Sequence, residues 1–238
     1  MQRIFHTPEG VRDIYSQECS RKQKLQEKLH RVFHQYGFED IETPTFEYFE
    51  VFSKEVGTIP SRDLYKFFDR EGNTLVLRPD FTPSVSRACA TYFNPEKEVV
   101  SLCYTGNTFI NNSSFRGRLK ETTQMGVERM GDDSPEADAE ILAMTVECLL
   151  ATGLTEFQVS VGQVDYYKAI FAQTGMSQEE EEELRELISQ KNYFGVEELV
   201  KNKNMDKSLA RVLSQLPQMF GSTEVLEKAK SLTDNPQA

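Results

Sequence analysis

Two short polar stretches of the chain carry residue types that could hold a small charged molecule. The first spans residues 77–82, where the carboxylate of Asp80 and the hydroxyl of Thr82 lie between a predicted strand and a predicted helix. A carboxylate in such a turn can receive an ammonium group. The same two side chains could instead only cap the helix that follows, and the residues alone leave both interpretations open.

The second stretch is a predicted strand that contains Gln124, Gly126 and Glu128. Side chains two residues apart face the same side of a sheet, so these three positions share one face. Gly126 is expected to leave open space between the two polar side chains, which would form the floor of a pocket for a small zwitterion. The alternative is an ordinary exposed polar face, which the predicted burial of the neighbouring chain disfavours.

A third candidate is the polar loop over residues 106–120, which carries Arg116, Arg118 and Lys120. Arginines on a loop of this kind can clamp phosphates, although a solvated loop would have the same composition. The sequence contains no glycine-rich phosphate loop, no nucleophile elbow and no His-Glu-x-x-His helix.

The sequence predicts no metal site. His30 and His34 are four residues apart and share one face of a predicted helix, but no neighbouring cysteine or carboxylate pattern completes a ligand set, so a surface position is favoured. The four cysteines are far apart and are interpreted mainly as small core side chains: Cys19, Cys89, Cys103 and Cys148.

The hydrophobic pattern predicts the elements that must position these residues. Helices are expected over residues 16–36, 46–56, 84–92 and 135–152, and strands over 38–44, 65–68, 74–78, 99–105, 121–129 and 157–164. The remaining segment is helical, with a capping box at Ser177 and Glu180 and helices over 178–190, 195–202, 206–216 and 222–232. We therefore expect an α+β fold in which an antiparallel sheet is flanked by helices, with a core over 1–170 and a helical, insertion-type segment over 171–238.

Composition limits the class of protein. The 238 residues include 27 Lys and Arg against 38 Asp and Glu, a formal net charge of −11, with 38% hydrophobic and 11% aromatic residues. These values argue against a disordered chain and against a general nucleic-acid binder. No apolar run approaches the roughly 20 residues that cross a bilayer, and the first residues do not resemble a signal peptide, so a cytoplasmic protein is expected.

Four ordered motifs resemble the catalytic domain of the histidyl-tRNA synthetases, a class II synthetase fold. They are Thr-Pro-Glu-Gly-Val-Arg-Asp at 7–13, Tyr-Gly-Phe-Glu-Asp-Ile-Glu-Thr-Pro at 36–44, Leu-Arg-Pro-Asp-Phe-Thr at 77–82 and Gln-Met-Gly-Val-Glu at 124–128. The match covers about residues 5–170. It is closer still to the non-catalytic paralogues of these enzymes, the regulatory subunits of ATP phosphoribosyltransferase.

This resemblance implies a histidine-like pocket. Asp80, Thr82 and Gln124 stand at positions that contact the α-amino group in the family, and Glu128 stands at the position that contacts the imidazole. Asp80 is one methylene shorter than the glutamate of the synthetases.

The resemblance also implies that adenylation chemistry is lost. Ile110 stands where a class II synthetase has the arginine that grips the adenylate phosphate, and Asn112 stands where it has a glutamate. Loss of one electrostatic clamp of this kind typically costs on the order of 10²–10³ in rate. We therefore expect no catalytic residue and no cofactor.

The function implied is a regulatory subunit that supports the first step of histidine biosynthesis and relays histidine feedback. The expected partners are the catalytic ATP phosphoribosyltransferase subunit in a hetero-oligomer, a synthetase-like homodimer contact and free histidine, with no membrane and no tRNA. The chain ends before two glycine-rich stretches of the family, so part of the core sheet is expected to be absent, as in a fragment. The alternatives are a catalytic-domain fragment of a histidyl-tRNA synthetase and a structural pseudo-synthetase with another partner.

Overall fold

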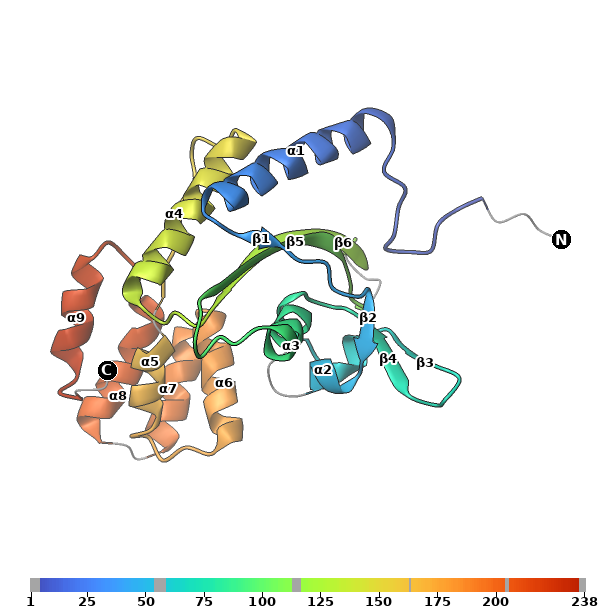
Figure 1. Cartoon of the computed structure of the whole chain (residues 1–238). Helices are drawn as coiled ribbons and strands as arrows, with labels where there is room; N and C mark the ends of the chain where they lie inside the picture. Colours follow the sequence, from blue (N-terminus) through green and yellow to red (C-terminus); the bar gives the residue numbers. More distant parts are fainter. Residues whose placement is uncertain (1–4, 54–58, 113–116, 163, 204–205, 236–238) are drawn as a thin grey trace. The chain divides into compact units, whose positions relative to one another are not determined.

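The computed structural model describes residues 5–53, 59–112, 117–162, 164–203 and 206–235 (Figure 1). The chain divides into two compact units, Met1–Gln158 and Val159–Ala238. The sequence placed a boundary after residue 170, and the role of the two segments as separate domains stays a prediction.

The central sheet of the first unit contains β1 (Glu39–Asp40), β5 (Val100–Phe109) and β6 (Glu121–Met130), in the order β1-β5-β6. The long strands β5 and β6 form the predicted antiparallel hairpin, whereas β1 is a short parallel neighbour of β5. Strand β5 runs to Phe109, further than the predicted end at residue 105, because its ladder with β6 continues through the polar residues that the sequence assigned to a loop.

Helices cover both faces of this sheet (Figure 1). On one face α1 (Ser16–Gln35) and α4 (Pro135–Thr152) pack over a core of Val32, Phe33, Phe38, Cys103 and Met144. On the other face α3 (Thr82–Tyr92) packs over a core of Phe81, Val85, Cys89, Val100, Leu102 and Tyr104. Because helices pack on both faces, most of the first half of β5 is buried, whereas the residues of β6 are mostly half-buried.

A second, smaller sheet contains β2 (Phe46–Tyr48), β4 (Thr74–Leu77) and β3 (Lys66–Phe68), in the order β2-β4-β3, and all its pairings are antiparallel. The predicted hairpin of β3 and β4 is confirmed. The helix predicted over 46–56 is wrong at its start, because Phe46–Tyr48 alternates across a strand and places Glu47 inward against Arg87 of α3, at 2.7 Å. Only α2 (Glu50–Ser53) is helical there, and residues 54–58 lie outside the described part.

The strand predicted over residues 157–164 is also wrong. Residues 157–162 form no regular element, and α5 (Val164–Phe171) begins where the strand was expected to end. An alternating apolar pattern becomes a strand only when a neighbour takes up its backbone N–H and C=O groups, and no strand in the described part of the chain pairs with this segment.

The second unit is helical, as predicted. After α5 come α6 (Gln178–Ser189), α7 (Tyr193–Asn202), α8 (Lys207–Gln215), a short 3-10 helix (Leu216–Gln218) and α9 (Glu224–Leu232). The predicted capping box of Ser177 and Glu180 opens α6. These helices enclose a core of their own, which includes Ile170, Leu184, Val196, Val212 and Leu213. Within the described residues, no helix combines the length and apolar character needed to cross a membrane.

Candidate functional site

Asp80 lies directly after β4, at the start of the turn into α3. Its Oδ1 atom accepts hydrogen bonds from the backbone N–H of Phe81, at 2.7 Å, and from the side-chain amide of Gln124, at 3.1 Å. Both bonds that Asp80 accepts from described residues end on Oδ1. The Oδ2 atom is therefore the oxygen that could receive a donor from a ligand.

Glu128 lies four residues after Gln124 on the same face of β6. Its Oε1 atom accepts from the hydroxyl of Thr82, at 2.6 Å, and more weakly from the hydroxyl of Tyr104, at 3.4 Å. Burial raises the pKa of Glu128, and the charge of Asp80 acts in the same direction, although the two hydroxyl donors oppose the shift. Burial likewise raises the pKa of Tyr104, so its phenol stays protonated and can donate.

The structure thus brings Asp80, Thr82, Gln124 and Glu128 together, from two elements that are far apart in sequence. The capping alternative does not hold, because Phe81 is the N-cap of α3 and no side chain caps that end. Thr82 is the first residue of the helix and directs its hydroxyl to the sheet. The result is a pair of half-buried carboxylates, each with one oxygen fixed by the protein, which is suited to binding cationic or N–H donor groups.

The open space expected at Gly126 is filled by Tyr104. A Cβ atom at position 126 would lie 2.4 Å from the Tyr104 hydroxyl, because Tyr104 is directly opposite Gly126 in the ladder. The Tyr104 ring also stacks on Phe81, with ring centroids 4.3 Å apart. Gly126 is therefore required so that Tyr104, which stacks on Phe81 and donates to Glu128, can pack against β6. The open space expected above Gly126 is not present.

Arg78 is a structural residue of this site that the sequence analysis missed. It is buried, and its guanidinium donates to the backbone carbonyls of Thr43, at 2.8 Å, and Asn107, at 2.9 Å. The same group lies over the ring of Phe81, at 4.0 Å from the centroid. Arg78 therefore ties the Asp80 turn to β5 of the central sheet and to the segment that connects β1 with β2. Its position in the Leu-Arg-Pro-Asp motif was visible in the sequence, but the distant carbonyls to which it donates were not.

The three basic residues predicted in the loop over residues 106–120 differ in their surroundings. Arg116 lies outside the described residues, Arg118 is exposed, and the stem of Lys120 packs against Gly10. The backbone N–H of Ile110 donates to the carbonyl of Lys120 at 2.9 Å, which extends the hairpin by one step. The phosphate clamp expected from Arg116, Arg118 and Lys120 therefore stays a prediction from the sequence alone.

The interpretation of the two histidines needs a correction. His30 and His34 do lie on the surface of α1, but Asp40 and Cys103 lie beside them and complete a group of four metal-ligating side chains. The sequence analysis found no such partner because strand pairing, and not sequence spacing, brings Asp40 and Cys103 to α1. The core interpretation of the cysteines is confirmed for Cys89 and Cys103, which are buried.

Comparisons with known proteins agree with the resemblance. A family model for histidyl-tRNA synthetase matches residues 10–238. The chain is 40% identical over 234 residues to the ATP phosphoribosyltransferase regulatory subunit of Acetivibrio thermocellus, covering 98% of this chain and 56% of that protein. It is 38% identical over 235 residues to the subunit of the same name from Clostridium acetobutylicum, covering 98% and 58%. The chain thus spans somewhat more than half the length of these relatives.

A solved structure supports the fold. The crystal structure of an ATP phosphoribosyltransferase regulatory subunit/histidyl-tRNA synthetase from Bacillus halodurans superposes with a TM-score of 0.88 at 31% identity, covering 100% of this chain and 62% of that one. Together with the family match, this confirms the predicted class II synthetase-like α+β fold.

Proposed function

The chain belongs to the histidyl-tRNA synthetase family, and from this premise we propose that it acts as a non-catalytic regulatory subunit of ATP phosphoribosyltransferase, in the first step of histidine biosynthesis. The names of its relatives support this role. The observation that carries the proposal is a contrast between two sets of residues. The residues that resemble the histidine pocket are present and connected, whereas the charged residues that would activate ATP are replaced.

The replaced positions lie at the end of the β5–β6 hairpin. Ile110 is half-buried and offers no charge, and Asn112 donates from its amide to the carbonyl of Leu119 at 3.5 Å. An isoleucine cannot stabilise the charge that develops on a phosphate during adenylation, and such a clamp is typically worth on the order of 10²–10³ in rate. A chain that keeps an amino-acid pocket without this clamp is suited to sensing an amino acid.

The pocket residues have the chemistry that free histidine requires. The Oδ2 atom of Asp80, with Thr82 and Gln124 nearby, would accept from an α-ammonium group, and the Oε2 atom of Glu128 would accept from an imidazole N–H. The carboxylate of the ligand has no strong partner at position 110. Since a charge-assisted hydrogen bond contributes roughly 1.5–3 kcal/mol, affinity should be about ten- to a hundred-fold below that of a synthetase.

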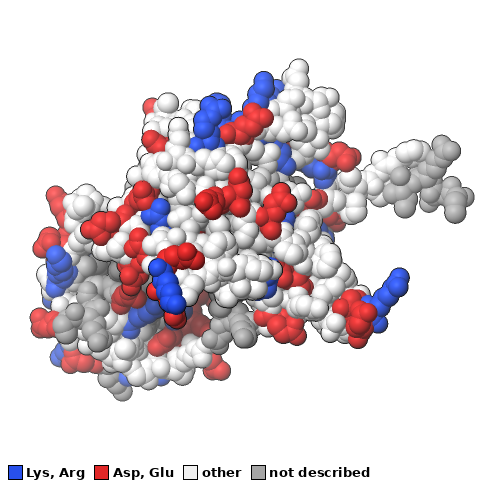
Figure 2. Space-filling view, viewed as in Figure 1, with Lys and Arg blue, Asp and Glu red and all other residues white. Residues whose placement is uncertain are grey.

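Surface charge favours a protein partner over tRNA. On the face shown in Figure 2, acidic side chains are spread widely and the basic ones form small separate groups. The net charge of −11 has the wrong sign for a general affinity for nucleic acid. We place the protein in the cytoplasm, in a hetero-oligomer with the catalytic transferase subunit that also contains a synthetase-like homodimer contact.

Histidine-dependent ATP–pyrophosphate exchange separates this role from that of a ligase. We expect no exchange above background for this chain. An active histidyl-tRNA synthetase, measured under the same conditions, is the positive control. Measurable exchange that disappears in an Ile110→Asp variant would show that another group performs the role of the arginine, and the chain would then be a synthetase domain.

Calorimetry with L-histidine tests the pocket. The chain and a polypeptide extended to the length of its relatives are measured side by side, with Asp80→Ala and Glu128→Ala as variants and the exposed Glu71→Ala as the matched control. We expect weak binding that both pocket variants abolish and the control preserves. Binding that is unchanged in both pocket variants would place histidine at another site.

A further inference from the structure

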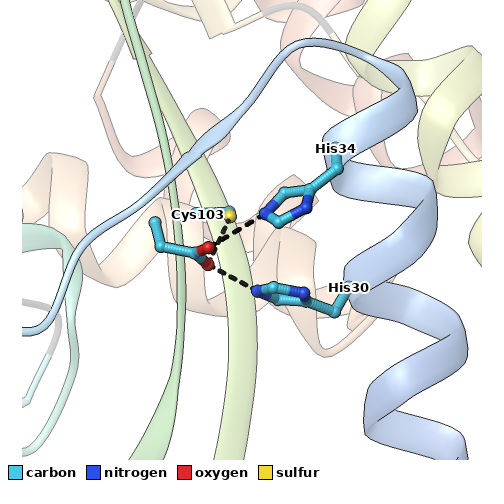
Figure 3. A group of neighbouring side chains, drawn as sticks. His30, His34 and Cys103 are labelled. Atoms are coloured by element: carbon cyan, nitrogen blue, oxygen red, sulfur yellow. Dashed lines mark hydrogen bonds and ion pairs between the residues drawn. The ribbon is translucent and has the colours of Figure 1, made fainter.

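Four potential metal ligands meet where α1 crosses the edge of the central sheet (Figure 3). Asp40 accepts hydrogen bonds on one carboxylate oxygen from His30 Nε2, at 2.5 Å, and on the other from His34 Nε2, at 3.0 Å. The thiol of Cys103 donates to the first oxygen at 3.4 Å. One ligand atom from each residue can be chosen so that all four lie within 4.8 Å of one another.

The fold holds these side chains in place from three elements. His30 and His34 are one helical turn apart on α1, so their rings project from the same face. Asp40 on β1 and Cys103 on β5 are direct partners in the parallel pair, so their side chains share one face of the sheet. The buried residues Val32 and Phe33 fix the same turn of α1 against Cys103.

We propose that His30, His34, Asp40 and Cys103 bind one divalent transition-metal ion, with Zn²⁺ as the best fit. Two imidazoles, one carboxylate and one thiolate are a donor set that zinc accepts in four-coordinate sites. Zinc–ligand bonds of about 2.0–2.3 Å require neighbouring ligand atoms to be roughly 3.3–3.7 Å apart in a tetrahedron. The four atoms lie within 4.8 Å of one another, so small side-chain rotations would bring them to these separations and admit the ion between the histidines and Asp40.

The charges of the site also suit a divalent cation. Asp40 brings one negative charge, and Cys103 brings a second once its thiol proton passes to solvent as the metal–sulfur bond forms. Both histidines bind as neutral imidazoles through Nε2. The ion would therefore be neutralised without any further ligand, and no oxidant or reductant is needed because zinc does not change its oxidation state.

Access to the site is open on one side. Cys103 is fully buried beneath the cluster, whereas the side chains of His30, His34 and Asp40 are 37%, 45% and 57% exposed. A bound ion would join α1 to β1 and β5 and lock this corner of the first unit.

The alternative is a cluster that is complete as it stands, in which Asp40 only fastens α1 to the sheet by hydrogen bonds. Titration with Co²⁺ distinguishes the two, because cobalt reports its ligands by absorption. The experiment uses the untagged chain, stripped of metal and kept reduced. We expect one Co²⁺ per chain, with a thiolate-to-cobalt charge-transfer band and the intense visible bands of four-coordinate cobalt, and displacement of both by Zn²⁺.

Variants identify the ligands. The side chain of His34 is exposed, so the His34→Gln variant should keep its fold. The loss of one ligand should nevertheless weaken Zn²⁺ binding by at least about 10–100-fold. Cys103→Ala should remove the charge-transfer band. The matched controls are His6→Gln, which changes the remaining histidine, and Cys19→Ser, which changes a cysteine on the same helix. Absence of the charge-transfer band in the parent chain, or equal Zn²⁺ affinity in His34→Gln and the parent, would overturn the proposal, which does not depend on the regulatory function.

Discussion

Replacing Gly126 by alanine tests whether the aromatic layer under the candidate pocket is packed as closely as the structure shows. Gly126 lies on β6 directly opposite Tyr104 on β5. The added methyl carbon would lie 2.4 Å from the Tyr104 hydroxyl and 2.6 Å from its Cζ atom. These distances are roughly 1 Å inside an ordinary contact of about 3.5 Å, so the tyrosine ring has to move.

The ring has little room to move. Tyr104 is 5% exposed, and Phe81 stacks on it with an interplanar angle of 7° and a centroid distance of 4.3 Å. Displacing it would also break the donor bond to Glu128. Inserting a methyl group into a well-packed core usually costs about 1–3 kcal/mol, and we expect Gly126→Ala to fall in that range.

Hydrogen–deuterium exchange of peptides from β5 and β6 measures this loss of stability in the two strands themselves. The unfolding of the helical unit does not contribute to the signal of these peptides. Because each 1.4 kcal/mol is a factor of ten, amides of these strands should exchange about five- to 150-fold faster in Gly126→Ala. In the double variant Tyr104→Ala/Gly126→Ala the clash is absent, so the two effects should couple by roughly 0.5–3 kcal/mol.

Gly162→Ala is the matched control, because among the described residues, its chain neighbours aside, no atom lies within 4 Å of the position that its Cβ would take. It should change exchange in β5 and β6 by less than about twofold, in line with the small effects of surface substitutions. Exchange in Gly126→Ala that equals the parent, or effects that add fully in the double variant, would refute the close packing of Tyr104 on Gly126.

Three further predictions follow from single contacts. Burial raises the pKa of Glu128 above 4.5, so the folded chain holds this proton to higher pH than the unfolded chain, and the parent loses stability as pH rises through that window. Glu128→Gln should therefore gain stability relative to the parent in urea denaturation as pH rises above the ordinary glutamate pKa of 4.5, and a constant difference would contradict this. Arg78→Met leaves the carbonyls of Thr43 and Asn107 without their donor, and thermal unfolding should show a loss of about 1–3 kcal/mol for each. Ser177→Ala removes the N-cap of α6 and should cost about 1 kcal/mol in the helical unit by circular dichroism, whereas no change would argue against the capping box.

The hydrophobic pattern and the helix-capping residues correctly predicted several helices. Helix α4 has the bounds 135–152 that its hydrophobic pattern predicted, and the structure shows Ser134 as its N-cap and Gly153, with a φ of 98° that favours glycine, as its C-cap. Helix α6 begins at the capping box of Ser177. The motifs also gave Asp80 and Glu128 as candidate pocket residues, and the structure places Thr82 and Gln124 in hydrogen bonds with them, while the role of the pocket stays a prediction.

The remaining features depend on partners that lie far away in the sequence. Phe46–Tyr48 became a strand because β4 pairs with it, and Phe157 did not, because no described strand does. The contact of Tyr104 with Gly126 depends on the register of β5 and β6, which period-two alternation alone does not set. Asp40 and Cys103 are 63 residues apart, so no spacing rule could have joined them to the histidines.

Activation of the isolated catalytic subunit of ATP phosphoribosyltransferase tests the regulatory role most directly. The chain is titrated into a fixed concentration of that subunit, and the rate of phosphoribosyl transfer to ATP is measured, with a histidyl-tRNA synthetase of matched concentration as the control. We expect the rate to rise with the chain and to saturate, and the synthetase to have no effect. A rate that stays at the level of the isolated subunit, with a folded chain present in excess, would contradict the regulatory role.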